Sequence, residues 1–144
     1  MKIKNVVVIG SGTMGSGIAA HLCNANIPVT LLDLKTEISE QARDKIYKSR
    51  PPLLLDKSKI NNIKVGNIKD NFDIVKEADW VVEAVVERID IKHDIYEKIF
   101  KERKDGAIVS SNTSSIPIKI LSQNLSDEEK KDFCITHFFN PVRY

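Results

Sequence analysis

The sequence predicts an α/β fold built on a doubly wound, mainly parallel sheet with helices on both faces. Two observations predict it. Short apolar runs typical of buried strands alternate with longer segments of helical periodicity along most of the chain. Polar and glycine-rich residues follow the apolar runs, and ligands bind parallel sheets at the carboxyl ends of their strands. We therefore expect right-handed crossovers between strands and one functional site along a single edge of the sheet.

The first predicted strand, 6–9, leads directly into a glycine-rich turn and then a helix. The turn has G-x-G-x-x-G spacing, and its residues are Gly10, Ser11, Gly12, Thr13, Met14 and Gly15. At this spacing Gly10 permits the tight turn, Gly12 lets backbone amides approach a pyrophosphate, and Gly15 brings the helix close to the sheet. The phosphates would lie at the positive end of that helix. The motif by itself is weak evidence for dinucleotide binding, so the rest of the sequence has to support that interpretation.

The second predicted strand, 29–32, ends at Asp33, 18 residues after Gly15. Dinucleotide-binding proteins carry an acid about 20 residues after the glycines, where it accepts hydrogen bonds from the adenosine ribose. A carboxylate there would repel a 2′-phosphate, which favours NAD over NADP. The alternative interpretation is an ordinary turn residue at the end of a strand.

The remaining elements continue the alternation of helices and strands. In order, they are a helix marked by Ile38, Ala42 and Ile46 and stopped by Pro51-Pro52, an arm over 53–62, a weak strand over 63–65, a short helix or turn over 72–78, a strand over 80–86, a helix over 89–103, a strand over 107–109, one or two helical turns over 117–121, a short solvated helix over 127–132 and a strand over 134–136.

Two predicted strand ends carry residues suited to catalysis. His137 follows the last strand, and an imidazole can accept a hydroxyl proton while hydride leaves the same carbon for NAD⁺. Ser114 and Asn112 lie in the polar run 110–115 and could hydrogen-bond a substrate hydroxyl or carbonyl. The alternatives are a core histidine beside two phenylalanines and local turn chemistry in the polar run.

Composition excludes several classes of function. The 144 residues suit one domain, and a net charge of +2 indicates neither nucleic acid nor an anionic membrane as partner. No apolar run approaches the 18 to 20 residues (roughly) of a membrane span, and the first strand begins too early for a signal peptide. Cys23 and Cys134 are far apart and predict reduced thiols, with no metal site and a cytoplasmic location.

Five motifs in the chain resemble the NAD-binding domain of L-3-hydroxyacyl-CoA dehydrogenases, which has a Rossmann-type fold. They are GSGTMGSGIA (10–19), LLD (31–33), ADWVVEAVVE (78–87), SNTSS (111–115) and THFFNP (136–141). They occur in the family's order across nearly the whole chain. IAAHL in the first helix and the ending HFFNPVRY are similar to the forms fused to an enoyl-CoA hydratase.

The resemblance implies NAD-dependent oxidation of L-3-hydroxyacyl-CoA to 3-ketoacyl-CoA in fatty acid β-oxidation. It makes His137 the catalytic histidine and Ser114 the serine that touches both the nicotinamide and the substrate's 3-oxygen. It also implies that Glu87, Lys92 and Asn140 contact the cofactor on its nicotinamide side and that Asp33 contacts the adenosine ribose. Ser49 matches a serine that contacts coenzyme A. The family's CoA-binding lysine has no clear match, because Pro51-Pro52 disturbs the spacing before Lys57 and Lys59.

The resemblance also implies that residues 1–144 are an NAD-binding domain truncated at its C-terminus. The family's helical C-terminal domain and the glutamate that pairs with the histidine would follow Tyr144. We therefore expect this chain alone to turn over poorly, and the full-length form to be a homodimer or part of a multifunctional chain acting on acyl-CoA. The alternatives are a dehydrogenase of a free 3-hydroxy acid and a non-catalytic NAD-binding module.

Overall fold

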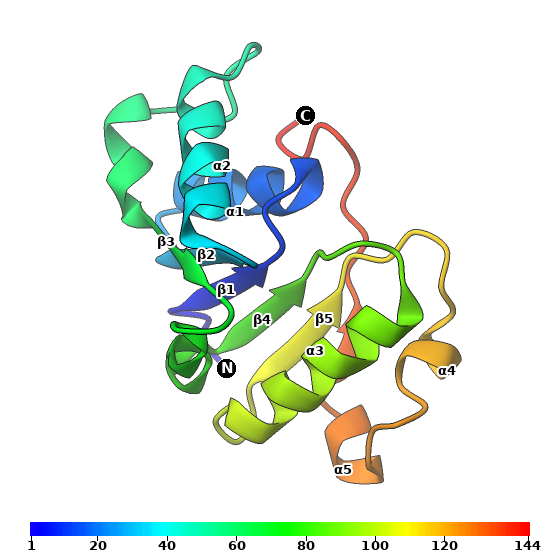
Figure 1. The fold of residues 1–144 in the computed structure, drawn as a ribbon. Coiled ribbons are helices and arrows are strands. Elements are labelled where there is room, and N and C mark those ends of the chain that lie inside the picture. The colour runs from blue at the N-terminus through cyan, green and yellow to red at the C-terminus, as the bar shows by residue number, and fades with distance from the viewer.

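A computed structural model describes residues 1–144 and contains a six-stranded sheet in the order β3-β2-β1-β4-β5-β6 (Figure 1). The strands are β1 (Val6–Ile9), β2 (Val29–Asp33), β3 (Ile63–Asn67), β4 (Trp80–Glu83), β5 (Ile108–Ser111) and β6 (Phe133–Ile135). Every neighbouring pair is parallel. The chain runs outward from β1 in one direction and from β4 in the other, so the doubly wound prediction is confirmed.

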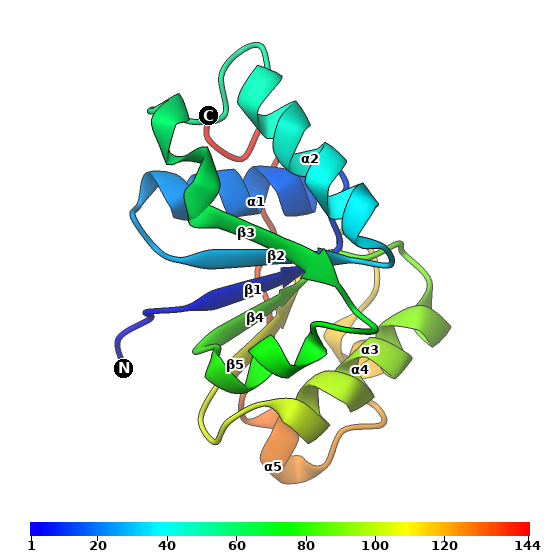
Figure 2. The same ribbon diagram turned by 60° about the vertical axis from the view of Figure 1, so that its left-hand side comes forward.

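Helices cover both faces of this sheet. The longer ones are α1 (Thr13–Asn24), α2 (Thr36–Lys48) and α3 (Ile89–Glu102), and the short ones are η1 (Lys57–Asn62), η2 (Phe72–Glu77), α4 (Ile118–Leu121) and α5 (Asp127–Lys130). Figures 1 and 2 show α1 and α2 on one face and α3 on the other. None of these helices combines the length and apolarity needed to cross a membrane.

Side chains of each strand alternate between two apolar layers. Val6 and Val8 pack beneath α1 and α2, in a cluster that includes Ile18. Val7 and Ile9 point the other way, into the cluster beneath α3 and η2. The central strands are therefore buried on both faces, which explains why their sequences are almost continuously apolar.

Strand β4 is shorter than its sequence predicts. We expected it to extend to Val86, but it ends at Glu83, which is paired with the last residue of β1, Ile9. Beyond that point the Val85 amide donates to the Glu83 carboxylate at 2.9 Å, and Val86 is 59% exposed. The run continues past the end of β1, so Val85 and Val86 form a wall of the crevice above the sheet.

The segment after β6 returns across α1 to the arm that follows α2 (Figure 2). A Cβ placed on Gly17 of α1 would lie 2.9 Å from Cγ2 of Val142, so helix and segment are in close contact. At the arm, Arg143 Nη1 and the Tyr144 hydroxyl both donate to the Pro52 carbonyl, at 2.6 and 3.1 Å. The segment therefore joins the end of the sheet to the arm.

Candidate functional site

The glycine-rich turn lies between β1 and α1, above the point where the two halves of the sheet diverge. Gly10 has φ +102°, and a Cβ there would lie 2.4 Å from the Ala84 carbonyl oxygen. A Cβ on Gly15 would lie 1.7 Å from the Gly10 carbonyl oxygen, so only glycine allows α1 to start this close to the sheet. A Cβ on Gly12 would have no other atom within 4 Å, so there is open space beside the free amides of the first turn of α1.

Asp33 at the end of β2 holds the turn in place. Its Oδ2 accepts hydrogen bonds from the Ser11 amide at 2.8 Å and the Ser11 hydroxyl at 2.5 Å, and Oδ1 accepts from the Leu34 amide at 2.7 Å. Ser11 therefore faces the carboxylate rather than the phosphate position. Both lone pairs of Oδ2 are therefore used, whereas Oδ1 retains one that a ribose hydroxyl can use.

Two hollows meet above the carboxyl ends of β1 and β4. The larger, about 570 Å³, is largely apolar and is lined by Gly10, Ser11, Gly12, Thr13, Met14, Asp33, Leu34, Ile38, Ile68, Ala84, Val85, Val86, Ile91 and Ile95. The smaller, about 330 Å³, is lined by Met14, Ala84, Val85, Glu87, Asn112, Ser114, His137, Phe138, Phe139 and Asn140. They share Met14, Ala84 and Val85, so one continuous groove runs from Asp33 to His137.

A buried charged network lies directly beneath this groove. Glu83, whose side chain is fully buried, accepts hydrogen bonds from Lys92 Nζ at 2.6 Å, the Tyr96 hydroxyl at 2.5 Å and the Ser111 hydroxyl at 2.7 Å. Burial, reinforced by the Glu83 carboxylate, raises the pKa of Tyr96, so its phenol stays a donor. The sequence analysis missed this network. Glu83 within the apolar run 80–86 is the sequence feature that could have revealed the network. A carboxylate buried with such a run needs a buried cation as its partner.

Glu87 connects that network to the polar loop after β5. Its Oε1 lies 3.0 Å from Lys92 Nζ, and its Oε2 accepts from the Thr113 hydroxyl at 2.8 Å and the Ser115 hydroxyl at 3.1 Å. Partial burial by itself would raise the pKa of Glu87. The bonds from Lys92 and then Thr113 outweigh it, so the pKa lies below its ordinary value and the side chain is ionised at neutral pH.

Lys92 lies behind Glu87 and away from the open groove. Its side chain is 1% exposed, and its ammonium lies between Glu83, Glu87 and the Val85 carbonyl. The nicotinamide-ribose contact expected from the sequence would therefore have to pass through Glu87. A direct contact to Lys92 stays a prediction.

The expected catalytic residues come together in the smaller hollow. His137 and Ser114 are exposed to it, and neither side chain hydrogen-bonds to another part of the chain. The His137 ring lies 4.8 Å from the Phe139 ring, centroid to centroid. Asn140 lines the same hollow, and Asn112 Oδ1 accepts the Phe138 amide at 2.9 Å. Residues from β4, β5 and β6 thus converge as the strand ends predicted.

Ser49 lies outside both hollows. Its hydroxyl donates to the Ile46 carbonyl at 2.8 Å and accepts the Leu53 amide at 2.9 Å, which fixes the bend between α2 and the arm. Lys57 lies over the Tyr47 ring, and Lys59 Nζ bonds Asn26 Oδ1 at 2.6 Å. These contacts give no reason to choose either lysine as a coenzyme A ligand.

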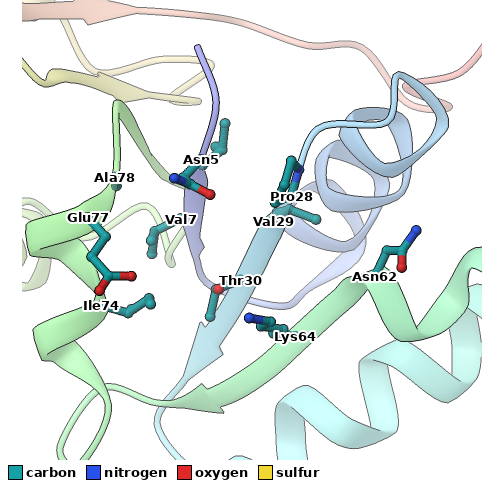
Figure 3. A pocket seen from close by; sticks show the side chains of 11 residues that line it. Asn5, Val7, Pro28, Val29, Thr30, Asn62, Lys64, Ile74, Glu77 and Ala78 are labelled. Atoms are coloured by element: carbon teal, nitrogen blue, oxygen red, sulfur yellow. The ribbon is translucent and has the colours of Figure 1, made fainter.

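A separate cavity of about 70 Å³ lies at the opposite, amino end of the strands (Figure 3). Asn5, Thr30 and Lys64 project toward it from β1, β2 and β3 or their starts, and Glu77 from η2. The space is too small for a nucleotide, and no glycine turn or long-helix N-terminus faces it. The ligand groove is therefore the one at the carboxyl ends.

The groove fits an extended dinucleotide. An apolar hollow ending at a carboxylate suits an adenosine, the open space beside Gly12 suits a pyrophosphate, and the smaller hollow beyond Met14, with its mixed polar and apolar lining, suits a nicotinamide. Residues 5–144 match the family model described as 3-hydroxyacyl-CoA dehydrogenase, NAD binding domain. The chain belongs to this dehydrogenase family. Its cofactor is accordingly NAD.

Relatives agree with this family assignment. The chain is 42% identical to a "Probable 3-hydroxyacyl-CoA dehydrogenase" of Deinococcus radiodurans, over 100% of this chain and 44% of that protein. It is 37% identical to the fatty acid oxidation complex subunit alpha of Idiomarina loihiensis, over 98% of this chain and 20% of that protein. Among solved structures, 3-hydroxybutyryl-CoA dehydrogenase of Escherichia coli superposes with a TM-score of 0.85 at 26% identity, covering 99% of this chain and 31% of that one.

This NAD-binding domain is a minor part of most such relatives. It spans 21% and 44% of the lengths of two of the curated proteins most similar to it. The groove that starts at Asp33 lies within this domain. The His137 hollow lies at its open end.

Proposed function

We propose that the protein carrying this domain oxidises L-3-hydroxyacyl-CoA to 3-ketoacyl-CoA, with NAD as hydride acceptor, in fatty acid β-oxidation. One observation carries the proposal: His137 and Ser114 line a hollow continuous with the glycine-loop groove. This arrangement would put a proton acceptor and a hydroxyl donor beside the position of a nicotinamide.

In this proposal two polar groups of the smaller hollow, His137 and Ser114, act on the substrate oxygen. The His137 imidazole accepts the proton of the 3-hydroxyl, and the Ser114 hydroxyl donates a hydrogen bond to the same oxygen. NAD, when bound, accepts the hydride from the carbon. Asn112, which we expected to bind substrate, already uses its Oδ1 on the Phe138 amide, so only its Nδ2 is free to donate.

The cofactor would be held along the whole groove. Asp33 Oδ1 would accept a hydrogen bond from the adenosine ribose, and the amides at the start of α1 would bind the pyrophosphate. Glu87 and Asn140 would contact the nicotinamide side, with Lys92 acting on the cofactor through Glu87. Ser11, Thr13 and Met14 would shape the turn and the wall that the two hollows share.

The relatives support a proposal for the substrate and the assembly. Ser49 would contribute to coenzyme A recognition at the arm, and the acyl-CoA substrate would enter from the side of His137. We propose that the full-length protein is a homodimer or part of a multifunctional chain; a relative from Rickettsia felis is described as a putative fatty acid oxidation complex trifunctional enzyme. The free thiols of Cys23 and Cys134 suit a reducing compartment such as the cytoplasm.

The test is a His137→Gln substitution in the full-length protein, assayed with acetoacetyl-CoA and NADH. Loss of a general base costs roughly 10²- to 10⁴-fold, so kcat should fall by that factor. NADH binding measured by calorimetry should remain close to the wild-type value, because the groove is unchanged.

His21→Gln is the matched control, since His21 is exposed on α1 and lies outside both hollows. Its kcat should equal that of the wild type. Full activity of the His137→Gln protein would rule His137 out as the base. Absence of turnover by the wild type would refute the proposed activity itself.

A further inference from the structure

The side chain of Asn112 bridges the two segments that carry His137 and Ser114. Asn112 Oδ1 accepts the Phe138 amide at 2.9 Å, across 26 residues of sequence. The backbone N–H of Asn112 donates to the Glu83 carbonyl at 2.9 Å, so the backbone of Asn112 is anchored to the end of β4. A half-buried side chain on a fixed backbone is well placed to hold a neighbouring segment.

The bond to Phe138 continues the pattern of the β5–β6 pair beyond the strands. The last main-chain bond of the pair runs from the Thr136 amide to the Ser111 carbonyl, at 3.0 Å. In a parallel pair, alternate amides of one strand bond to its neighbour, so the next donor is Phe138. The acceptor in a continued strand would be the Thr113 carbonyl, but the Asn112 amide oxygen takes its place.

The Asn112 side chain replaces a main-chain acceptor here because the backbone after Asn112 turns away from β6. The Thr113 amide bonds the Ser111 hydroxyl at 3.2 Å, and the Thr113 hydroxyl bonds Glu87 at 2.8 Å. These contacts direct the Ser114 loop toward Glu87 and away from the His137 segment. Asn112 is therefore the last residue of this loop that hydrogen-bonds to the His137 segment.

We infer that Asn112 is a positioning residue that sets the spacing between the His137 imidazole and the Ser114 hydroxyl. The inference rests on the proposed function, because it assigns both groups to one substrate oxygen. Asn112 acts through Phe138: without the amide acceptor, the His137 segment loses its last tie to β5. The role belongs to Oδ1, which distinguishes it from substrate binding by Nδ2.

Two variants of the full-length protein separate these roles. Asn112→Ala removes the acceptor, and Asn112→Asp keeps an acceptor for Phe138 but removes the Nδ2 donor. Misplacement of a catalytic group by about 1 Å can cost on the order of 100-fold, so we expect Asn112→Ala to lower kcat by roughly 10- to 100-fold. The KM for NADH should not change, since the groove around the glycine turn is intact.

Asn112→Asp should recover most of the lost kcat. An amide-exchange measurement gives a readout independent of activity: Phe138 should lose protection in Asn112→Ala and keep it in Asn112→Asp. Asn124→Ala, which removes an amide bonded to His93 outside the hollow, is the matched control and should behave as wild type.

The outcomes separate the two proposals. If Asn112→Asp is as impaired as Asn112→Ala while Phe138 stays protected, Asn112 binds substrate through Nδ2 and the inference is overturned. Unchanged kcat and unchanged Phe138 exchange in Asn112→Ala overturn it as well. A wild-type protein without dehydrogenase activity would refute the proposed function, whereas the exchange of Phe138 would still decide whether Asn112 holds the segment.

Discussion

Glu83 makes four polar contacts in a region where water cannot replace them. They come from the Val85 amide, Lys92, Tyr96 and Ser111. Lys92 is the only cation among them, so the buried carboxylate depends on that one ammonium for charge compensation. The dependence makes Lys92 important to stability before any role with the cofactor is considered.

We expect Lys92→Met to lower the free energy of unfolding by about 3–5 kcal/mol, because Glu83 would be left buried and unpaired. Urea unfolding followed by circular dichroism measures the change. The double variant Glu83→Gln/Lys92→Met should recover part of the loss, since a neutral amide needs no cation. Lys98→Met, at an exposed position of α3, is the control, and a loss no larger than in this variant would contradict the pairing argument.

At the residue scale the sequence predicts where the site lies better than how its side chains are used. Asp33, Glu87, Ser114 and His137 could be named as candidates because each lies at or shortly after the end of a strand. The buried position of Lys92 could not be foreseen, since its partner Glu83 comes from an adjacent element. The use of Asn112 Oδ1 on Phe138 likewise depends on how β5 and β6 are paired.

At the element scale, the contact between α1 and the segment after β6 restricts what α1 can carry. Gly17 lies inside the helix, where glycine is intrinsically less favourable than alanine. A methyl group there would lie 2.9 Å from Cγ2 of Val142. Glycine in place of alanine therefore lets the segment after β6 pack closely against α1. The segment is the one that delivers His137.

This contact predicts a coupling between Gly17 and Val142. In a Val142→Ala background, Gly17→Ala should raise the free energy of unfolding by roughly 0.5–1 kcal/mol through helix propensity. In the wild-type background the clash should reduce or reverse that gain. A double-mutant cycle in urea measures the difference, and equal effects in both backgrounds would disprove the coupling.

Strand ends were harder to predict than strands because pairing, not apolarity, decides where a strand stops. The run 80–86 is apolar throughout apart from Glu83, yet β4 ends where β1 no longer offers a partner. Conversely, Ser110 and Ser111 belong to β5 although they read as the start of a polar loop. Both are buried and hydrogen-bonded to neighbouring side chains, which local sequence does not reveal.

For the whole molecule, the alternation of strands and helices was sufficient to predict the parallel, doubly wound sheet. The two ends of the parallel strands have different roles. The carboxyl ends of the strands carry the groove. At the amino ends, Asp79 just before β4 accepts the amides of Lys4 and Asn5 at 2.7 and 3.0 Å and bonds Lys104 Nζ at 2.5 Å.

These bonds predict how acid affects the stability of the molecule. The hydrogen bond from Lys104, followed by those from Lys4 and Asn5, lowers the pKa of Asp79 to about 2. A carboxyl with a lowered pKa stabilises the fold above its unfolded pKa of about 3.9 and loses that contribution as the pH falls toward the folded value. Between those two pH values, the urea midpoint of Asp79→Asn should therefore fall less steeply than that of the wild type.

Asp105→Asn serves as the control for that experiment, because Asp105 is exposed and makes no ion pair within the chain. Its midpoint should follow the wild-type curve. A steep wild-type-like fall in Asp79→Asn would mean that other carboxylates govern unfolding in acid.

Trp80 at the start of β4 gives the protein a built-in optical probe. It is the only tryptophan in the chain, and its indole N–H donates to Ser110, whose hydroxyl also accepts from Thr136, next to His137. Indole emission overlaps the absorption of reduced nicotinamide, so bound NADH should quench this one emitter by energy transfer. Cofactor exchange should thus be measurable by fluorescence in unlabelled residues 1–144, which contain no second tryptophan.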